Sequence, residues 1–167
     1  TGKVNKEKLP NLYDYKYDEL LKLKGVPGIR GKIGIPLVLN LYDNLPFWHS
    51  FFTNLGYEVI LSDRSSKALY SLGQHTIPSD TICYPAKLVH GHIQSLIDKG
   101  LQTIFYPCMT YNVNEDMGDN HFNCPVVAYY PEVVEGNMNL EHVKFLYPYV
   151  YLEDKRIFDQ KMFEYFK

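Results

Sequence analysis

Three cysteines are the side chains of this chain that are best suited to binding a metal. Cys83 stands in CYPAK, just before a predicted helix, where the helix dipole favours a thiolate. Cys108 ends a predicted strand in YPC, and Cys124 begins the next predicted strand in NCP. They form no compact CxxC pair, so their spacing alone favours ordinary buried, reduced thiols over a metal site.

The predicted elements place two of these cysteines at one edge of a sheet. Cys83 and Cys108 lie in connections at the carboxyl edge, where they could share an inorganic cluster. If a strand at 125–130 is parallel to its neighbours, Cys124 begins that strand at the opposite edge. We therefore expect either that the long loop before Cys124 crosses to the carboxyl edge, or that Cys124 is not a ligand.

Two histidines and a lysine follow Cys83 on the same predicted helix. His90 and His92 are two residues apart and point about 200° away from each other, so they cannot chelate one ion together. His92 falls on the apolar stripe and is expected to pack in the core, whereas His90 could face the site. Lys87 lies in the first turn, where the dipole disfavours a cation, so it either meets an anion or thiolate or is simply solvated.

We expect one cleft at the carboxyl edge of the sheet, because ligands bind there in open α/β sheets. The side chains expected to bind substrate in this cleft, together with Cys83 and Cys108, are Asn40, Tyr42, Ser79, Asp80, Lys87 and His90. Cys83 is expected to be a metal ligand rather than a nucleophile. The nearest candidate base, His90, lies about 10 Å further along the helix axis.

Apolar runs alternate with helix-spaced segments along the chain. Strands are predicted at 32–39, 57–62, 102–107, 125–130 and 143–150. Helices are predicted between them, with Asn44 and Ser65 as N-caps and Gly56 as a helix stop. This order predicts a Rossmann-like α/β domain with a mostly parallel sheet and helices on both faces.

The same patterns divide the chain into three parts. Residues 1–30 are polar and tyrosine-rich, and we expect them to be a linker or the tail of a preceding domain. Residues 31–150 form the Rossmann-like domain. Residues 151–167 are expected to begin a truncated helix, as in a segment of a larger protein.

Composition excludes several classes of protein. The formal net charge of -2 shows no basic excess, which argues against a nucleic-acid partner. No run reaches the ~18 apolar residues of a membrane span and no signal-peptide pattern is present, so a cytoplasmic protein with reduced thiols is expected. Neither a dinucleotide fingerprint nor a Walker-type loop is present, so this segment is not expected to bind ATP alone.

Several long segments, in order, resemble one known domain. They are GIPLVLNLYDNLPFWHSFFTNLGYEVILSDRSS, IPSDTICYPAKLVHGHI, IFYPC and DNHFNCPVVAYYPEVV, within residues 31–137. Together they resemble the conserved domain of activase-related proteins of the 2-hydroxyacyl-CoA dehydratase system. In such proteins the domain lies beside ATPase modules of the BadF/BadG type, which drive low-potential electron transfer through a 4Fe–4S cluster.

The resemblance implies a set of ligands and partners. In dehydratase-like subunits of that system, three cysteines on a Rossmann-like fold bind a cluster, which implies this role for Cys83, Cys108 and Cys124. ATP would bind only in a neighbouring domain, and the implied partners are ATPase modules, a dehydratase-like region and an acyl-CoA in anaerobic bacteria. Leu37 stands where the family pattern GIPRVLN has a basic residue, so this chain lacks that candidate anion contact.

Two other functions are compatible with the same residues. The domain could dock an ATPase module onto a dehydratase-like partner without catalysis, its cysteines reduced and metal-free. It could also hold a small-molecule site for an acyl-CoA.

Overall fold

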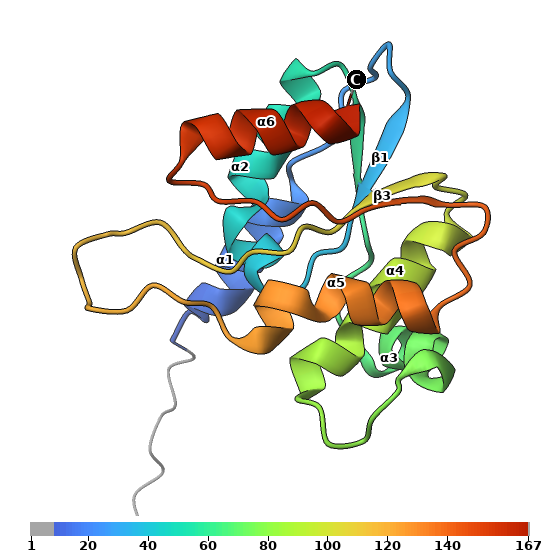
Figure 1. Cartoon of the computed structure of the whole chain (residues 1–167). Coiled ribbons are helices and arrows are strands. Elements are labelled where there is room, and N and C mark those ends of the chain that lie inside the picture. Colours follow the sequence, from blue (N-terminus) through green and yellow to red (C-terminus); the bar gives the residue numbers. More distant parts are fainter. Residues whose placement is uncertain (1–8, 167) are drawn as a thin grey trace, which may run out of the picture.

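The computed structural model describes residues 9–166 and contains a parallel sheet between helices (Figure 1). The strands are β1 (Lys32–Ile35), β2 (Glu58–Leu61), β3 (Thr103–Phe105) and β4 (Lys144–Leu146). Their order is β2-β1-β3-β4, and every pairing is parallel. The predicted α/β Rossmann-like fold is therefore confirmed, although the strands are shorter than the apolar runs.

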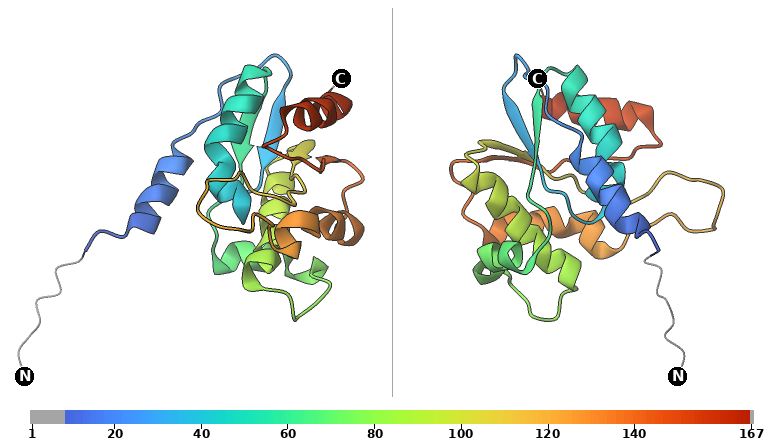
Figure 2. Two further views of the ribbon diagram at one scale, coloured as in Figure 1. Left: turned by 60° about the vertical axis from the view of Figure 1, so that its left-hand side comes forward. Right: turned by 180° about the vertical axis from the view of Figure 1, so that it is seen from behind.

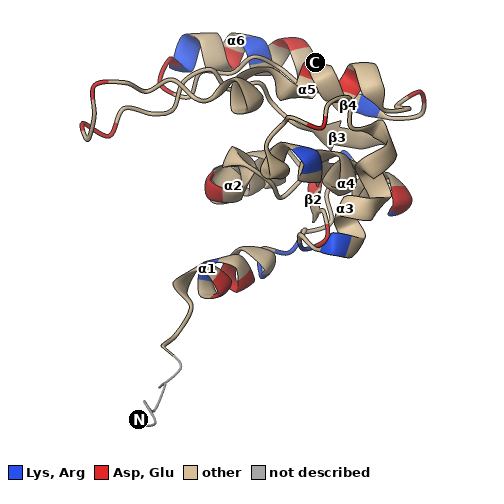
Figure 3. Ribbon diagram, turned by 90° about the horizontal axis from the view of Figure 1, so that it is seen from below, with Lys and Arg blue, Asp and Glu red and all other residues tan. Residues whose placement is uncertain are grey.

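Helices connect the strands and cover both faces of the sheet. They are α1 (Leu12–Leu21), α2 (Asn40–Asn54), α3 (Lys67–Gly73), the 3₁₀ turn η1 (Gln74–Thr76), α4 (Tyr84–Asp98), α5 (Pro125–Asn137) and α6 (Lys155–Phe166). Figure 3 shows α2 on one side of the strands and α4 on the other. No helix among residues 9–166 has the length and apolar character needed to cross a membrane.

The prediction of a strand at 125–130 is wrong, because this segment is the first half of α5. Its run of valines and tyrosines suits a strand, but Pro125 stands at the first turn, where a missing N–H is harmless to a helix. The buried side chains include Val127, Tyr130 and Val134, and this spacing of three and four is helical. The apolar run at 125–130 is too short to show the helical spacing, which becomes clear only when Val134 is included.

Two helix starts also differ from the predictions. Helix α2 begins at Asn40 instead of after Asn44, directly behind Leu39, whose φ of 54° lies in the left-handed region. The N-cap of α3 is Ser66 rather than Ser65, and the Ser66 side chain accepts the amide of Leu69 at 3.1 Å. The predicted stop at Gly56 agrees with its φ of 86°, a conformation that favours glycine.

An aromatic cluster fixes α2 and α6 to the same face of the sheet. The ring of Trp48 lies 4.6 Å from that of Phe105, and Phe52 lies 4.8 Å from the same ring. Phe158 and Phe166 of α6 extend the cluster over α2. The helix expected within 151–167 is thus part of the core packing.

Helix α1 lies within the segment expected to be a linker, and it packs beside α2 (Figure 2). Leu20 is buried, and the rings of Tyr17 and Tyr42 are 5.2 Å apart. Arg64 bridges Asp14 and Asp18 of α1 across exposed surface. The helix therefore contacts the domain through one buried leucine, tyrosine rings and ion pairs.

The closest helix contact in the fold joins α3 to α4. A Cβ at Gly91 would lie 2.1 Å from the backbone oxygen of Leu69, and one at Gly73 would lie 2.3 Å from the carbonyl carbon of His90. Only glycine permits this approach, which holds α4 against α3 along the carboxyl side of the sheet.

Candidate functional site

Two of the three cysteines occupy the same structural position on different helices. Cys83 is the N-cap of α4, with φ −61° and ψ 151°, and Cys124 is the N-cap of α5, with φ −62° and ψ 155°. Both are exposed, neither side chain makes a capping hydrogen bond, and a proline follows each within the first turn. Each thiol therefore lies at the positive end of a helix dipole.

The third cysteine is held by the end of the sheet. Beyond β3 the chain stays extended beside the segment after β4, because the amide of Cys108 bonds Pro148 O at 2.9 Å and Val150 N bonds Cys108 O at 3.0 Å. This pairing carries the buried Cys108 just past the carboxyl end of β3. Its backbone is thus fixed by strand-like hydrogen bonds.

Cys124 lies at the same edge, because the segment after it is a helix and not a strand. The loop between Cys108 and Cys124 returns to its own start: Asn123 donates from its side chain to Met109 O at 2.9 Å, and its amide bonds Thr110 O at 2.8 Å. The expectation that Cys124 begins a parallel strand at the opposite edge is therefore corrected.

A fully buried tyrosine, Tyr106, directly follows β3 at the edge of the sheet that carries the three cysteines. Tyr106 is fully buried, and its hydroxyl has no hydrogen-bond partner among the described residues. Burial raises the pKa of this phenol well above its usual value, and negative charge on the nearby Cys108, Tyr130, Cys124 and Cys83 side chains raises it further. The hydroxyl is thus within electrostatic reach of all three sulfur atoms and stays protonated.

The buried thiol differs chemically from the exposed ones. Burial raises the pKa of Cys108 to about 12, and the charge of Glu132 adds to this, while the nearby Tyr149 side chain opposes it. The proton of the Tyr149 hydroxyl is donated to Glu132 Oε1 at 2.6 Å. Cys108 is therefore a neutral thiol near pH 7 and must release a proton to bind a metal.

The sulfur atoms are not arranged around one ion. Among residues 9–166, no three or more His, Cys, Asp or Glu side chains are grouped closely enough to hold a single metal ion. All three cysteines are free thiols. A ligand that contacts all three must therefore be larger than one ion, or the thiols must move together when it binds.

A directed hydrogen-bond chain fixes a second buried tyrosine, Tyr130, to His90 of α4. The Thr76 hydroxyl donates to Gly73 O at 2.8 Å, so it must accept from His90 Nδ1, 2.7 Å away. This leaves His90 Nε2 to accept the proton of the Tyr130 hydroxyl at 2.9 Å. Burial, and then the charge of His75, lowers the pKa of His90 to about 4, so the ring is neutral.

His92 packs in the core as predicted. It is fully buried, and its two ring nitrogens lie 2.7 Å from Ser62 Oγ and 2.9 Å from Ser65 Oγ. Burial lowers its pKa to about 4. His90 is equally buried and serves as the partner of Tyr130.

The remaining predicted substrate residues are distributed over separate places. Ser79 and Asp80 lie in the loop before α4, where Lys87 Nζ donates to Asp80 O at 2.7 Å. This contact keeps the Lys87 cation in the first turn, near Cys83. Tyr42 faces α1, and Lys16 lies 5.0 Å from its ring centroid.

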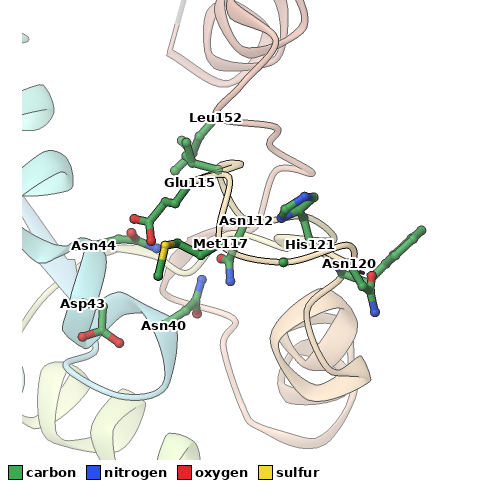
Figure 4. Close-up of a pocket in the computed structure, with 12 residues that line it drawn as sticks. Asn40, Asp43, Asn44, Asn112, Glu115, Met117, Asn120, His121 and Leu152 are labelled. Carbon is green, nitrogen blue, oxygen red and sulfur yellow. Dashed lines mark hydrogen bonds between the residues drawn. The ribbon is translucent and has the colours of Figure 1, made fainter.

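Asn40 lines a different cavity, of about 500 Å³, between the start of α2 and the loop 112–122 (Figure 4). Its side-chain nitrogen lies 2.8 Å from Met109 Sδ, while its buried side-chain oxygen has no hydrogen-bond partner in the part of the chain that the structure describes. Asp43 and Glu115 also line this cavity, and their carboxylates disfavour a phosphate group there. Met109, which Asn40 contacts, directly follows Cys108 in the chain.

The sequence analysis did not identify Tyr106 and Tyr130 as site residues. Tyr106 follows β3 in IFYPC, and this position predicts a place at the carboxyl edge of the sheet, as it does for Cys108. Tyr130 was hidden by the strand assigned to its segment. Helical spacing across 127–134 is the signal that would have placed it near α4.

Comparison with known proteins gives one match. Residues 32–167 match the family model described as CoA enzyme activase uncharacterised domain (DUF2229), in agreement with the resemblance found in the sequence. No curated protein and no solved structure gives a significant match.

Proposed function

The chain belongs to the family of the CoA enzyme activase uncharacterised domain, and from this premise we propose that it holds or receives a 4Fe–4S cluster for low-potential electron transfer. One observation supports the proposal: Cys83 begins α4, Cys108 follows β3 and Cys124 begins α5, all at one edge of the sheet, with the buried hydroxyl of Tyr106 in electrostatic reach of each. Cysteine thiolates are the usual ligands of such clusters.

The residues fit a cluster better than a single ion. A cluster of four irons is several ångström across, so its ligands need not be grouped around a single ion, as they are not among residues 9–166. Cys83 and Cys124 stand at helix N-termini, whose positive dipole ends suit an anionic group, and Cys108 would lose its proton on binding. When bound, such a cluster supplies a site that accepts and passes on one electron, and three protein ligands leave one iron open.

The proposed partners follow from the family. An activase domain acts together with an ATPase module and an acyl-CoA-transforming enzyme, and ATP would bind to the former rather than to this segment. We place the domain in a reducing, cytoplasmic setting, which suits its three free thiols.

A docking role is the second candidate, and an exposed apolar loop favours it. Tyr111, Val113, Met117 and Phe122 are exposed on the loop between Cys108 and Cys124. Large apolar side chains gathered on one loop are typical of a surface that a partner covers. In this alternative the cysteines stay reduced and metal-free.

The test is anaerobic purification of the full-length protein, followed by iron and sulfide analysis. We expect bound iron and broad absorbance near ~400 nm in the wild type, and a loss of both in Cys83→Ser, Cys108→Ser and Cys124→Ser. Met117→Ser is the matched control, because it removes an exposed sulfur from the neighbouring loop without removing a thiolate. If the wild type takes up no iron even after reconstitution with iron and sulfide, the docking role replaces the cluster.

A further inference from the structure

Tyr106 carries a hydroxyl that the folded chain leaves without a partner. The residue is fully buried, and its phenolic oxygen contacts neither a donor nor an acceptor among residues 9–166. Burying a hydroxyl without a hydrogen bond costs stability, and phenylalanine would fill the same space without that cost. A tyrosine at this position therefore needs a reason outside the metal-free fold.

The backbone holds this side chain rigidly in place. The Tyr106 amide bonds Leu146 O at 2.9 Å, which continues the pairing of β3 with β4. Cys108 lies two residues further along the same extended segment, and Cys83 and Cys124 cap the helices α4 and α5 at this edge. The sheet thus fixes the backbone of Tyr106 at the edge that also carries the three cysteines, and its buried hydroxyl makes no hydrogen bond among residues 9–166.

Tyr130, the other buried tyrosine described above, already uses its hydroxyl proton inside the protein. The chain from Gly73 through Thr76 and His90 commits the proton of Tyr130 to His90 Nε2. The hydroxyl of Tyr130 is therefore used inside the protein, whereas that of Tyr106 still has its proton to donate. The two buried phenols near Cys83 differ in that respect.

We propose that the Tyr106 hydroxyl donates a hydrogen bond to the sulfur-ligated group held by Cys83, Cys108 and Cys124. This inference rests on the proposed function and adds a tuning residue to it. A hydrogen bond to cluster sulfur or to a ligating thiolate stabilises the more negative, reduced form, so it raises the reduction potential. Tyr106 positions a neutral donor and does not itself ligate iron.

The experiment compares Tyr106→Phe with Tyr130→Phe in the full-length protein. In metal-free protein, we expect Tyr106→Phe to raise the midpoint of thermal unfolding by about 2–4 °C, because it removes an unpaired buried hydroxyl. Tyr130→Phe should lower the midpoint, because it leaves His90 Nε2 buried without a donor.

In anaerobically reconstituted protein, Tyr106→Phe should keep the iron content of the wild type. Its reduction should become about tenfold less favourable, which is a shift of about 59 mV to more negative potential for one electron. The potential is followed by redox titration of the absorbance near ~400 nm.

Each outcome decides between the two proposals. A gain in metal-free stability together with a more negative potential supports the role of Tyr106. An unchanged potential with normal iron content overturns this role alone and leaves the cluster in place. A Tyr106→Phe protein that is less stable without metal also overturns it, because the hydroxyl then has a partner in the fold. Absence of iron from reconstituted wild-type protein overturns both proposals.

Discussion

Replacing Gly91 with alanine should force α3 and α4 apart. The new Cβ would lie 2.1 Å from the backbone oxygen of Leu69 and 2.8 Å from its carbonyl carbon. Carbon atoms pack comfortably at about 3.5–4.0 Å, so these groups must separate by about 1 Å or more. Backbone atoms cannot rotate out of the way as a side chain can, so the helices themselves must move.

The magnitude follows from two opposing effects. Overpacking of a tight contact costs about 1–3 kcal/mol. The cost here should lie at the upper end of this range, because the two atoms that the new Cβ would approach most closely belong to the backbone of Leu69. Alanine gains about 0.8–1.0 kcal/mol over glycine inside a helix. We therefore expect a net loss of about 2 kcal/mol in the free energy of unfolding, or about 4–8 °C in the unfolding midpoint.

Gly136→Ala is the matched control. Gly136 is exposed in α5, and a Cβ there would meet no atom within 4 Å. The same substitution should therefore stabilise the protein by up to about 1 kcal/mol. The opposite signs separate the steric effect from the change in helix propensity.

The assay is urea and thermal unfolding of the wild type and both variants, followed by circular dichroism. Because α4 carries Cys83 at its N-terminus, displacement of the helix should also reduce iron uptake in Gly91→Ala. If Gly91→Ala is as stable as Gly136→Ala, then α3 and α4 are not in the close contact described above, and the reasoning fails.

Three further predictions concern acid stability, thiol reactivity and capping. Between pH 6.5 and about 4 the unfolded chain binds protons on His90 and His92 that the folded protein does not bind. As the pH is lowered through this range, the free energy of unfolding should therefore fall by about 3 kcal/mol per histidine. An unfolding free energy that stays constant over this range would contradict the prediction. In native metal-free protein at pH 8, a disulfide reagent should label the exposed cysteines quickly and Cys108 only after unfolding, so rapid labelling of all three thiols would disprove its burial. Ser66→Ala should cost about 1 kcal/mol in chemical denaturation, because the amide of Leu69 loses its cap, and an unchanged midpoint would show that water replaces the serine.

The sequence was a good guide wherever local pattern and fold agree. Apolar runs predicted the four strands of the sheet, and their alternation with helices predicted its parallel order. Gly56 marked the end of α2 because its positive φ is a local requirement. The apolar stripe of α4 correctly placed His92 in the core.

The wrong strand prediction at 125–130 arose because six residues are too few to distinguish a strand from a helix by their apolar pattern. Residues 125–130 are rich in β-branched and aromatic residues, and only the spacing that continues to Val134 indicates a helix. That error placed Cys124 at the wrong edge and hid the contact of Tyr130 with His90. The unpaired hydroxyl of Tyr106 is a consequence of tertiary packing, so no local pattern could have indicated it.

The distribution of the cysteines over three elements has a consequence for the order of assembly. The thiols are separated by 25 residues (83 to 108) and then by 16 residues (108 to 124), so they meet only when the sheet edge and two helix starts are already built. Closing such loops around a metal in the unfolded chain would cost entropy that a compact CxxC pair avoids. Under the proposed function, this domain would fold first and be loaded afterwards, unlike a zinc finger, which folds around its ion. Iron and sulfide would then reach a finished protein through the edge where Cys83 and Cys124 are exposed.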